Sequence, residues 1–214
     1  MVKRIDIKTN NRRSSIRQDI VNLPNMLTML RIIMIPLVLW FVYQETRIGN
    51  FWAVIFFALA AVTDVIDGWL ARRQGLISLL GQFLDPLADK LIILASLVAM
   101  VEINRVPSWV VIIIAARELC VTSLRTIAIS EGLVISAGQG GKDKAALQNV
   151  AVAMLILHDT YFVDFWLFDV TVSLNAVGLV MLYTSLFFAL TSAGEYVRMF
   201  VKAVEAKEKR SIDS

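Results

Sequence analysis

The sequence predicts an all-α, polytopic membrane protein in which six transmembrane helices surround a polar cavity that faces the cytoplasm. Hydrophobic residues make up 57% of the 214 residues, which is a larger share than soluble domains of this length usually have. Six segments are apolar enough to cross a bilayer, and a crossing helix needs about 20 such residues. The charged residues within these segments gather toward one side of the predicted membrane.

The helix boundaries follow from the apolar stretches and the residues that flank them. Pro24 and Pro107 suit the first turn of a helix, where the missing N–H of proline has no partner to lose. The fifth segment is the shortest. The predicted spans are residues 24–43, 51–71, 83–103, 107–129, 145–161 and 171–194.

One transmembrane domain, residues 23–200, is predicted between two charged tails, residues 1–22 and 201–214. The first tail is basic and has no apolar core, so it does not resemble a secretory signal peptide. Loops that are rich in Lys and Arg stay in the cytoplasm, and such loops alternate here with loops that are poor in cations. Both tails are therefore expected in the cytoplasm. The basic residues favour membrane lipids as partners, and nucleic acid is not expected.

Four aspartates on two consecutive predicted helices are the most informative feature. Asp64 and Asp67 are three residues apart near the end of one helix, and Asp85 and Asp89 are four residues apart near the start of the next. These spacings put each pair on one helix face, and the short connection makes the two helices antiparallel neighbours. The four carboxylates can therefore converge.

Four converging carboxylates in a site of low dielectric repel one another unless cations neutralise them. Oxygen ligands without His or Cys favour Mg²⁺ or Mn²⁺, and four aspartates suit a pair of such ions. The alternative is that two of the aspartates cap helix ends while the others pair with Arg72 and Lys90. A sequence with one cysteine and one histidine offers little to thiol or histidine sites.

The motif D-x2-D-G-x2-A-R-x8-G-x3-D-x3-D resembles the signature of the CDP-alcohol phosphotransferase family. Every position of the signature is occupied, by Asp64, Asp67, Gly68, Ala71, Arg72, Gly81, Asp85 and Asp89. The resemblance implies a six-helix membrane enzyme, usually a homodimer, that binds two divalent ions and the CDP group in a cavity open to the cytoplasm.

The resemblance also implies individual roles. Asp64, Asp67, Asp85 and Asp89 would bind the metal ions, with Asp64 and Asp85 shared between them, and Asp89 would act as the catalytic base. The remaining motif residues would line the CDP site, namely Gly68, Ala71, Arg72 and Gly81. The first predicted helix, with Asn25, Thr28 and Arg31, resembles the helix that approaches the nucleotide in one bacterial branch of the family.

In that branch the substrates are CDP-diacylglycerol and glycerol 3-phosphate. Arg117, Arg125, Lys142 and Lys144 match its pattern, and cations suit the phosphate of such an acceptor. Each of them also has a structural explanation, because Arg117 can pair with other helices, Arg125 can reach the membrane surface, and the two lysines satisfy the positive-inside rule. Ala145 departs from the pattern, since many relatives carry a hydroxyl residue there.

The expected location is the cell membrane of a bacterium, with the active site on the cytoplasmic side. Three other acceptors remain open within the family: phosphatidylglycerol, inositol phosphate and serine, which would make the chain a cardiolipin, phosphatidylinositol phosphate or phosphatidylserine synthase. A divalent-cation transporter is the alternative from another class. A transporter would need polar residues through the full depth of the membrane, whereas the outer halves of the predicted helices are almost entirely apolar.

Overall fold

The computed structural model describes the backbone of residues 23–74, 79–133, 140–165 and 168–212. Side chains are described within these ranges except at 23–25, 27, 64–74, 79–86, 89, 140–144, 161–165, 168–171 and 210–212. The described part of the chain is mostly helical, as predicted, and contains one two-stranded sheet. In chain order the elements are α2 (Leu23–Tyr43), α3 (Arg47–Gln74), α4 (Leu79–Glu102), α5 (Ser108–Ser130), α6 (Gly140–Leu157), β1 (Thr160–Phe165), β2 (Phe168–Ser173) and α7 (Leu174–Ile212).

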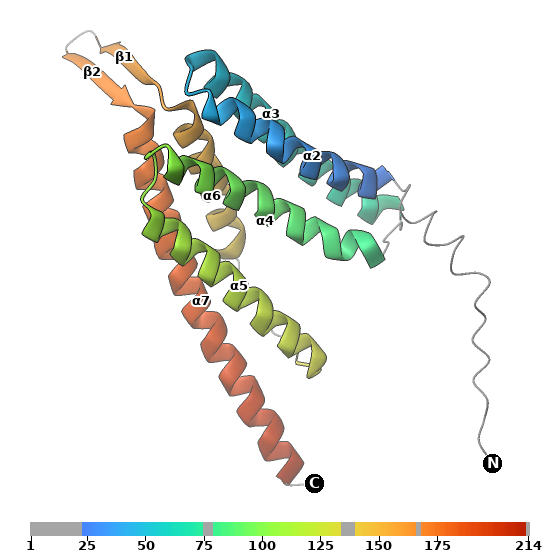
Figure 1. The fold of residues 1–214 in the computed structure, drawn as a ribbon. Coiled ribbons are helices and arrows are strands. Elements are labelled where there is room, and N and C mark those ends of the chain that lie inside the picture. The colour runs from blue at the N-terminus through green and yellow to red at the C-terminus, as the bar shows by residue number, and fades with distance from the viewer. Residues whose placement is uncertain (1–22, 75–78, 134–139, 166–167, 213–214) are drawn as a thin grey trace.

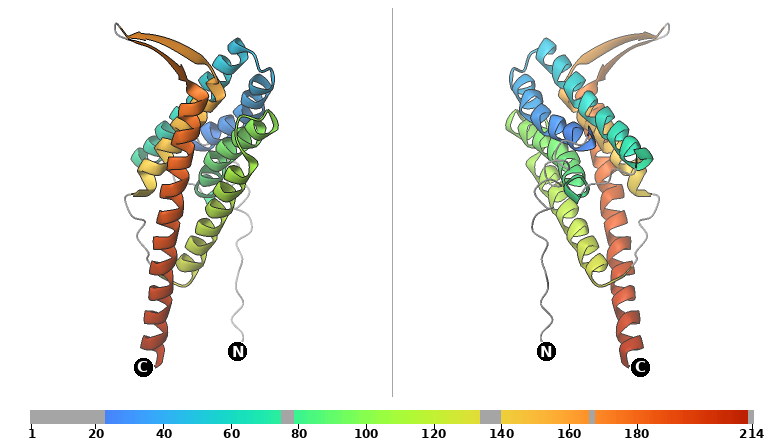
Figure 2. Two further views of the ribbon diagram at one scale, coloured as in Figure 1. Left: turned by 90° about the vertical axis from the view of Figure 1, so that its left-hand side faces the viewer. Right: turned by 90° about the vertical axis from the view of Figure 1, so that its right-hand side faces the viewer.

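Three connections lie together at one end of the molecule, which we call the loop end (Figures 1 and 2). They are the α2–α3 turn, the α4–α5 turn and the β1–β2 hairpin with its links to α6 and α7. Each helix therefore directs its other terminus away from the loop end. The end of α3 and the start of α4, which carry the four aspartates, lie at this opposite end together with the start of α2.

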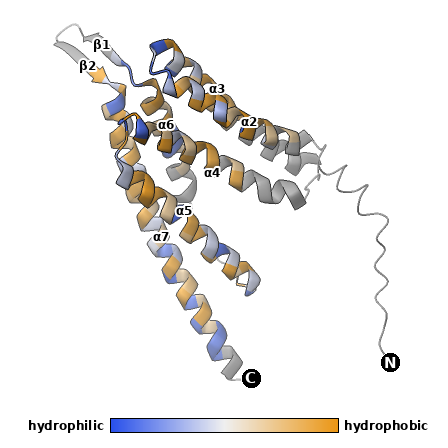
Figure 3. Ribbon diagram, viewed as in Figure 1, coloured by the Kyte–Doolittle hydropathy of each residue, from blue (hydrophilic) through white to orange (hydrophobic). Residues whose placement is uncertain are grey.

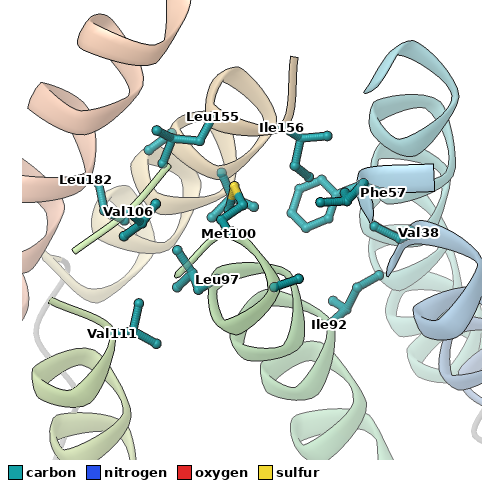
Figure 4. Close-up of a cluster of buried hydrophobic side chains, with 14 of the residues drawn as sticks. Val38, Phe57, Ile92, Leu97, Met100, Val106, Val111, Leu155, Ile156 and Leu182 are labelled. Atoms are coloured by element: carbon teal, nitrogen blue, oxygen red, sulfur yellow. The ribbon is translucent and has the colours of Figure 1, made fainter. Parts of the chain in front are cut away.

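The helices pack pairwise around one apolar core. Helix α2 packs along both α3 and α4, α6 packs along α7, and α5 also contacts α7. Figure 4 shows side chains from α2, α3, α4, α5, α6 and α7 meeting in this core. Its labelled members are Val38, Phe57, Ile92, Leu97, Met100, Val106, Val111, Leu155, Ile156 and Leu182.

A glycine allows α6 and α7 to approach closely. A methyl group added at Gly178 would lie 2.8 Å from Cγ of Leu155 and 3.2 Å from the carbonyl oxygen of Ala151. Lipid tails are as apolar as leucine side chains, so helices in a bilayer associate through close packing rather than through removal of apolar surface from water. Gly178 is therefore a packing requirement of this helix pair.

The ends of α4 and α5 are set by residues with left-handed backbone conformation. Asn104 (φ 58°) follows α4 and Gly132 (φ 69°) follows α5. In each case the next amide donates back to the helix, from Arg105 N to Met100 O at 2.8 Å and from Leu133 N to Ala128 O at 2.8 Å. This six-to-one hydrogen bond is characteristic of the Schellman motif, which satisfies carbonyl groups at a helix C-terminus.

The outer surface of the helices is strongly apolar. Large side chains such as Trp40 (69% exposed), Ile112 (65%) and Leu119 (68%) face outward, and Figure 3 shows hydrophobic residues along much of each helix. Exposed apolar surface on this scale is typical of a protein whose solvent is lipid. In the described residues one stretch, Leu174–Lys209, is long and apolar enough to cross a membrane, and shorter apolar helical stretches are Thr28–Tyr43, Arg47–Thr63 and Ala145–Leu157.

The hairpin corrects part of the sequence prediction. Residues 160–161 and 171–173 were expected at the ends of two helices, but they belong to β1 and β2, which pair antiparallel with Thr160 opposite Ser173. Both strands are rich in β-branched and aromatic residues, which favour extended structure. The all-α prediction is therefore correct for the bundle and wrong for this connection.

Helix α7 is much longer than the predicted span 171–194. It has 39 residues, which corresponds to about 58 Å at 1.5 Å per residue. The charged segment after residue 200 was predicted as a tail, but residues 201–212 continue the helix. Glu, Lys and Ala are strong helix formers, so a hydrophilic composition does not end a helix.

Arg105 connects several helix termini at the loop end. Its side chain is 5% exposed, and Nη1 donates to Oδ1 of Asn50 at 3.1 Å and to the carbonyl oxygen of Ile156 at 2.9 Å. Asn50 in turn donates to the carbonyl oxygen of Leu157 at 3.3 Å. Burial lowers the pKa of the Arg105 guanidinium and Glu45 acts in the opposite direction, but an arginine remains charged. One cation thus connects α3, the α4–α5 turn and the end of α6.

We expect Arg105→Ala to lower the thermal unfolding temperature in detergent, at a cost of about 2–4 kcal/mol, because two buried oxygens lose their donor. Arg47→Ala is the matched control at the same end. Arg47 pairs with Asp159 at 3.0 Å through a side chain that is 73% exposed, and exposed pairs contribute about 0–1 kcal/mol. Equal shifts for the two variants would contradict the role assigned to Arg105.

Candidate functional site

The four predicted aspartates lie on helical backbone at the opposite end of the bundle. Asp64 and Asp67 are in the last part of α3, and Asp85 and Asp89 are in the first half of α4. Their side chains lie outside the described residues, as do those of Asn25, Gly68, Ala71, Arg72 and Gly81. The predicted helix–turn–helix setting of the motif therefore agrees with the backbone, while the convergence of the carboxylates stays a prediction.

Among the described side chains, no group of three or more His, Cys, Asp or Glu residues is arranged to hold a metal ion. The predicted metal ligands are not among those side chains. The fit of divalent ions therefore depends on the chemistry of the four aspartates, whose hard oxygen donors suit Mg²⁺ or Mn²⁺.

Arg31 is placed close to the aspartate-bearing part of α3. Its side chain is 1% exposed, and Nε donates to the carbonyl oxygen of Ala60 at 3.3 Å. Ala60 precedes Asp64 by four residues, or about one helical turn. Thr28, three residues before Arg31, is fully buried, so two of the three predicted nucleotide-binding residues of α2 are directed into the bundle.

A second polar group joins α4 to α5. Lys90, the residue after Asp89, contacts Oε2 of Glu118 at 3.4 Å and the hydroxyl of Thr122. Glu118 also accepts a hydrogen bond from Nη1 of the neighbouring Arg117. The side chains of Lys90, Glu118 and Arg117 are 33%, 20% and 11% exposed. These charges neutralise one another in part, which lowers the cost of placing them within an apolar bundle.

Arg117 is also held by α7. Its Nε donates to the carbonyl oxygen of Ala189 at 3.1 Å, so the guanidinium connects two helices while its Nη1 contacts Glu118. Arg117 was predicted to bind the acceptor phosphate. Its observed contacts agree with the alternative that Arg117 pairs with other helices. A guanidinium has five N–H donors, so its other N–H groups can still bind a phosphate.

The other predicted acceptor residues are spread over two helices. Arg125 is exposed on α5, eight residues beyond Arg117, which is about 12 Å along a helix axis. Lys142 and Lys144 lie in the first turns of α6, and their side chains are outside the described residues. Gln148, one turn after Lys144, is 7% exposed. Arg125 and the two lysines thus lie toward the opposite end, while Arg117 lies near the middle of α5.

The end of α5 is tied to the extension of α7. Nζ of Lys207 donates to Oε2 of Glu131 at 2.7 Å and to the carbonyl oxygen of Glu131 at 2.9 Å. The hydrogen bond from Lys207 lowers the pKa of the Glu131 carboxyl below its ordinary value. Both side chains are exposed, so this contact orients the helices more than it stabilises them.

Two residues of the polar group were not predicted as site residues. Lys90 was considered only as a possible partner of an aspartate, and Glu118 only as a neighbour of Arg117 that could pair with another helix. The available signal was a charge directly beside a predicted functional residue within an apolar segment. Charges in such segments are usually paired or functional, but the sequence does not show which helix supplies the partner.

The sequence profile of the CDP-alcohol phosphatidyltransferase family matches residues 21–197. A Bacillus subtilis protein named CDP-diacylglycerol–glycerol-3-phosphate 3-phosphatidyltransferase is 34% identical over 82% of this chain and 93% of its own length. Proteins of the same name from Wigglesworthia glossinidia brevipalpis and Rickettsia felis are 31% and 33% identical, over 82% and 64% of this chain and 93% and 75% of their own lengths. These findings confirm the predicted family and agree with the predicted enzyme class.

We expect Arg31→Lys to raise the apparent KM for CDP-diacylglycerol about tenfold and to leave the KM for the acceptor unchanged, because a point charge cannot reproduce a buried guanidinium fork. Arg198→Lys, on the exposed surface of α7, is the matched control. Steady-state kinetics with each substrate varied in turn distinguishes the two constants. A change confined to the acceptor KM would rule out the nucleotide role of Arg31.

Proposed function

The chain belongs to the CDP-alcohol phosphatidyltransferase family, and from this premise we propose that it transfers a phosphatidyl group from CDP-diacylglycerol to sn-glycerol 3-phosphate. The products are phosphatidylglycerophosphate and CMP. The observation that carries the proposal is the complete aspartate motif on the consecutive helices α3 and α4, in a chain whose relatives are named for this reaction.

The proposed setting is the bacterial cell membrane, crossed six times, with both termini and a polar cavity on the cytoplasmic side. Support comes from the alternating direction of the helices and from the apolar side chains on their outer surface. Helices α2, α3 and α6 have described apolar stretches of fewer than 18 residues. In this topology their polar ends line the cavity, where water compensates the charges. We also propose that the enzyme acts as a homodimer, as the family resemblance implies.

The donor set of Asp64, Asp67, Asp85 and Asp89 suits two divalent cations, Mg²⁺ or Mn²⁺. When bound, such ions neutralise charge on the diphosphate and on the reacting oxygens. The assignment is supported by the positions of both aspartate pairs at the same end of antiparallel helices. Gly68, Ala71, Arg72 and Gly81 are proposed to line the CDP site together with Asn25, Thr28 and Arg31.

In the proposed reaction the free hydroxyl of glycerol 3-phosphate gives its proton to the carboxylate of Asp89. The hydroxyl oxygen forms a bond with the lipid-side phosphorus of CDP-diacylglycerol, and the bond from that phosphorus to the bridging oxygen breaks. CMP leaves with the electron pair. Arg72 is proposed to stabilise the negative charge that develops, as a guanidinium does in other phosphoryl transfers. No covalent enzyme intermediate is required.

The acceptor phosphate is proposed to bind among Arg117, Arg125, Lys142 and Lys144. Guanidinium forks and lysine ammonium groups bind phosphate well, whereas choline or ethanolamine would require negative charge. Because Arg117 is engaged by Glu118 and Ala189, we assign it to the inner boundary of this site and assign the more exposed Arg125 to its entrance.

An acceptor assay tests the proposal directly. We expect the purified protein, with CDP-diacylglycerol and Mg²⁺ or Mn²⁺, to release CMP when glycerol 3-phosphate is supplied. Phosphatidylglycerol and inositol phosphate, which are larger, and serine, which carries no phosphate, should release little, because the proposed site is built for an acceptor of the size and charge of glycerol 3-phosphate. Release of CMP with one of these three, and none with glycerol 3-phosphate, would refute the proposed acceptor.

We expect Asp89→Asn to reduce kcat by at least about a hundredfold, the usual scale of a general base, while the protein remains folded. Asp159→Asn is the matched control, because Asp159 lies at the loop end and pairs with Arg47. Its activity should equal that of the wild type. Near-normal turnover by the Asp89 variant would remove this residue as the base without affecting the identity of the acceptor.

A further inference from the structure

Glu118 joins three helices through two cations. Its Oε2 lies 3.4 Å from Nζ of Lys90 on α4, and its Oε1 accepts a hydrogen bond from Nη1 of Arg117 on α5. Arg117 in turn reaches α7 through the carbonyl oxygen of Ala189. Lys90 has a further contact with the hydroxyl of Thr122, one helical turn after Glu118. The carboxylate of Glu118 is the centre of this connection.

The location of this connection distinguishes it from an ordinary ion pair. Lys90 follows Asp89 directly in α4, so Glu118 holds a side chain adjacent in sequence to the proposed base. Arg117 is one of the proposed acceptor ligands. The same carboxylate therefore contacts the residue that follows the proposed base in α4 and one of the proposed ligands of the acceptor phosphate.

The net charge of this connection favours the binding of an anion. In the described contacts Lys90 and Arg117 share this carboxylate, and these three side chains together carry a net charge of one positive. Lys90 is one third exposed, and it can reach a ligand without leaving Glu118. A dianionic phosphate near this group would be attracted, and its position would depend on where Glu118 holds the two cations.

We propose that Glu118 is a positioning residue for the acceptor, which acts through Lys90 and Arg117 rather than by touching the substrate. This inference rests on the proposed function, because it concerns the same acceptor. Glu118 fixes the distance between the α4 residues around Asp89 and the cations of α5. It thereby aligns the acceptor hydroxyl with the base.

Charge and position predict opposite results when the carboxylate is neutralised. If Glu118 served only as a counter-ion, Glu118→Gln would make the site more positive, and the KM for glycerol 3-phosphate would fall. If Glu118 positions the two cations, their loss of alignment outweighs the gain in charge, and this KM rises. A purely structural role would alter the thermal stability without separating the two substrates.

The test is a kinetic comparison of Glu118→Gln with the wild-type enzyme. We expect the KM for glycerol 3-phosphate to rise about tenfold, the usual scale for losing a charge-assisted contact, with the KM for CDP-diacylglycerol unchanged. Glu131→Gln is the matched control, because Glu131 also forms an ion pair from α5 but to Lys207, outside this group. Its constants should not change. A lower or unchanged acceptor KM for Glu118→Gln would overturn the proposal.

Two further variants keep the test informative if Glu118→Gln does not fold. Glu118→Asp keeps the charge but shortens the side chain, so it should give an acceptor KM between those of the wild type and Glu118→Gln. In a cycle with Lys90→Met, the effects of the two single changes on kcat/KM for the acceptor should not add, because both break one contact. Additive effects would show that Glu118 does not act through Lys90. If wild-type enzyme releases no CMP with glycerol 3-phosphate, the proposed function fails instead.

Discussion

A charged side chain that is withdrawn from water costs several kcal/mol unless another charge, a polar group or water compensates it. This constraint explains two of the buried polar groups in the described part of the chain. Arg105 is compensated by an asparagine and a carbonyl oxygen at the loop end, and Lys90 and Arg117 are compensated by Glu118 within the bundle. The cost of burial thus requires these residues to connect helices, and the same connections define how the helices are arranged.

The two polar groups have different consequences for the bundle. Through one nitrogen, Arg105 connects α3 with the end of α6. The helix termini at the loop end are therefore held together. Asn104, with its left-handed backbone, ends α4 there. At the opposite end the acidic and the basic residues belong to four separate helices, α2, α3, α4 and α5. A fixed loop end allows these helices to hold a common register at their other termini, where substrate binding is proposed. Sites are more exact when they are built on rigid elements than on loops.

Much of the bundle could be predicted because apolar length and capping residues act locally. The predicted spans 24–43, 83–103 and 107–129 differ from α2, α4 and α5 by at most four residues at either end. The hairpin was missed because Thr160, Tyr161 and Val172 are also compatible with the apolar ends of helices, and only strand pairing resolves such short runs. The length of α7 was missed because the charged residues after 200, such as Lys202, Lys207 and Lys209, were interpreted as a tail, although lysine is a good helix former.

The aspartate motif was predictable from the sequence because its information lies in spacing along two consecutive helices. The connection through Glu118 was not, because it depends on how α4 faces α5, and Lys90 and Glu118 are 28 positions apart in the sequence. Adjacent charges such as Arg117 and Glu118 indicate that they can pair with other helices, but they do not reveal that Lys90 is a partner of the carboxylate. A cation that is held from two sides cannot move toward a substrate without a cost in free energy. Its binding energy is therefore used to align the substrate and not to reposition the side chain. Alignment raises the reaction rate only when the reacting groups already lie close to one another.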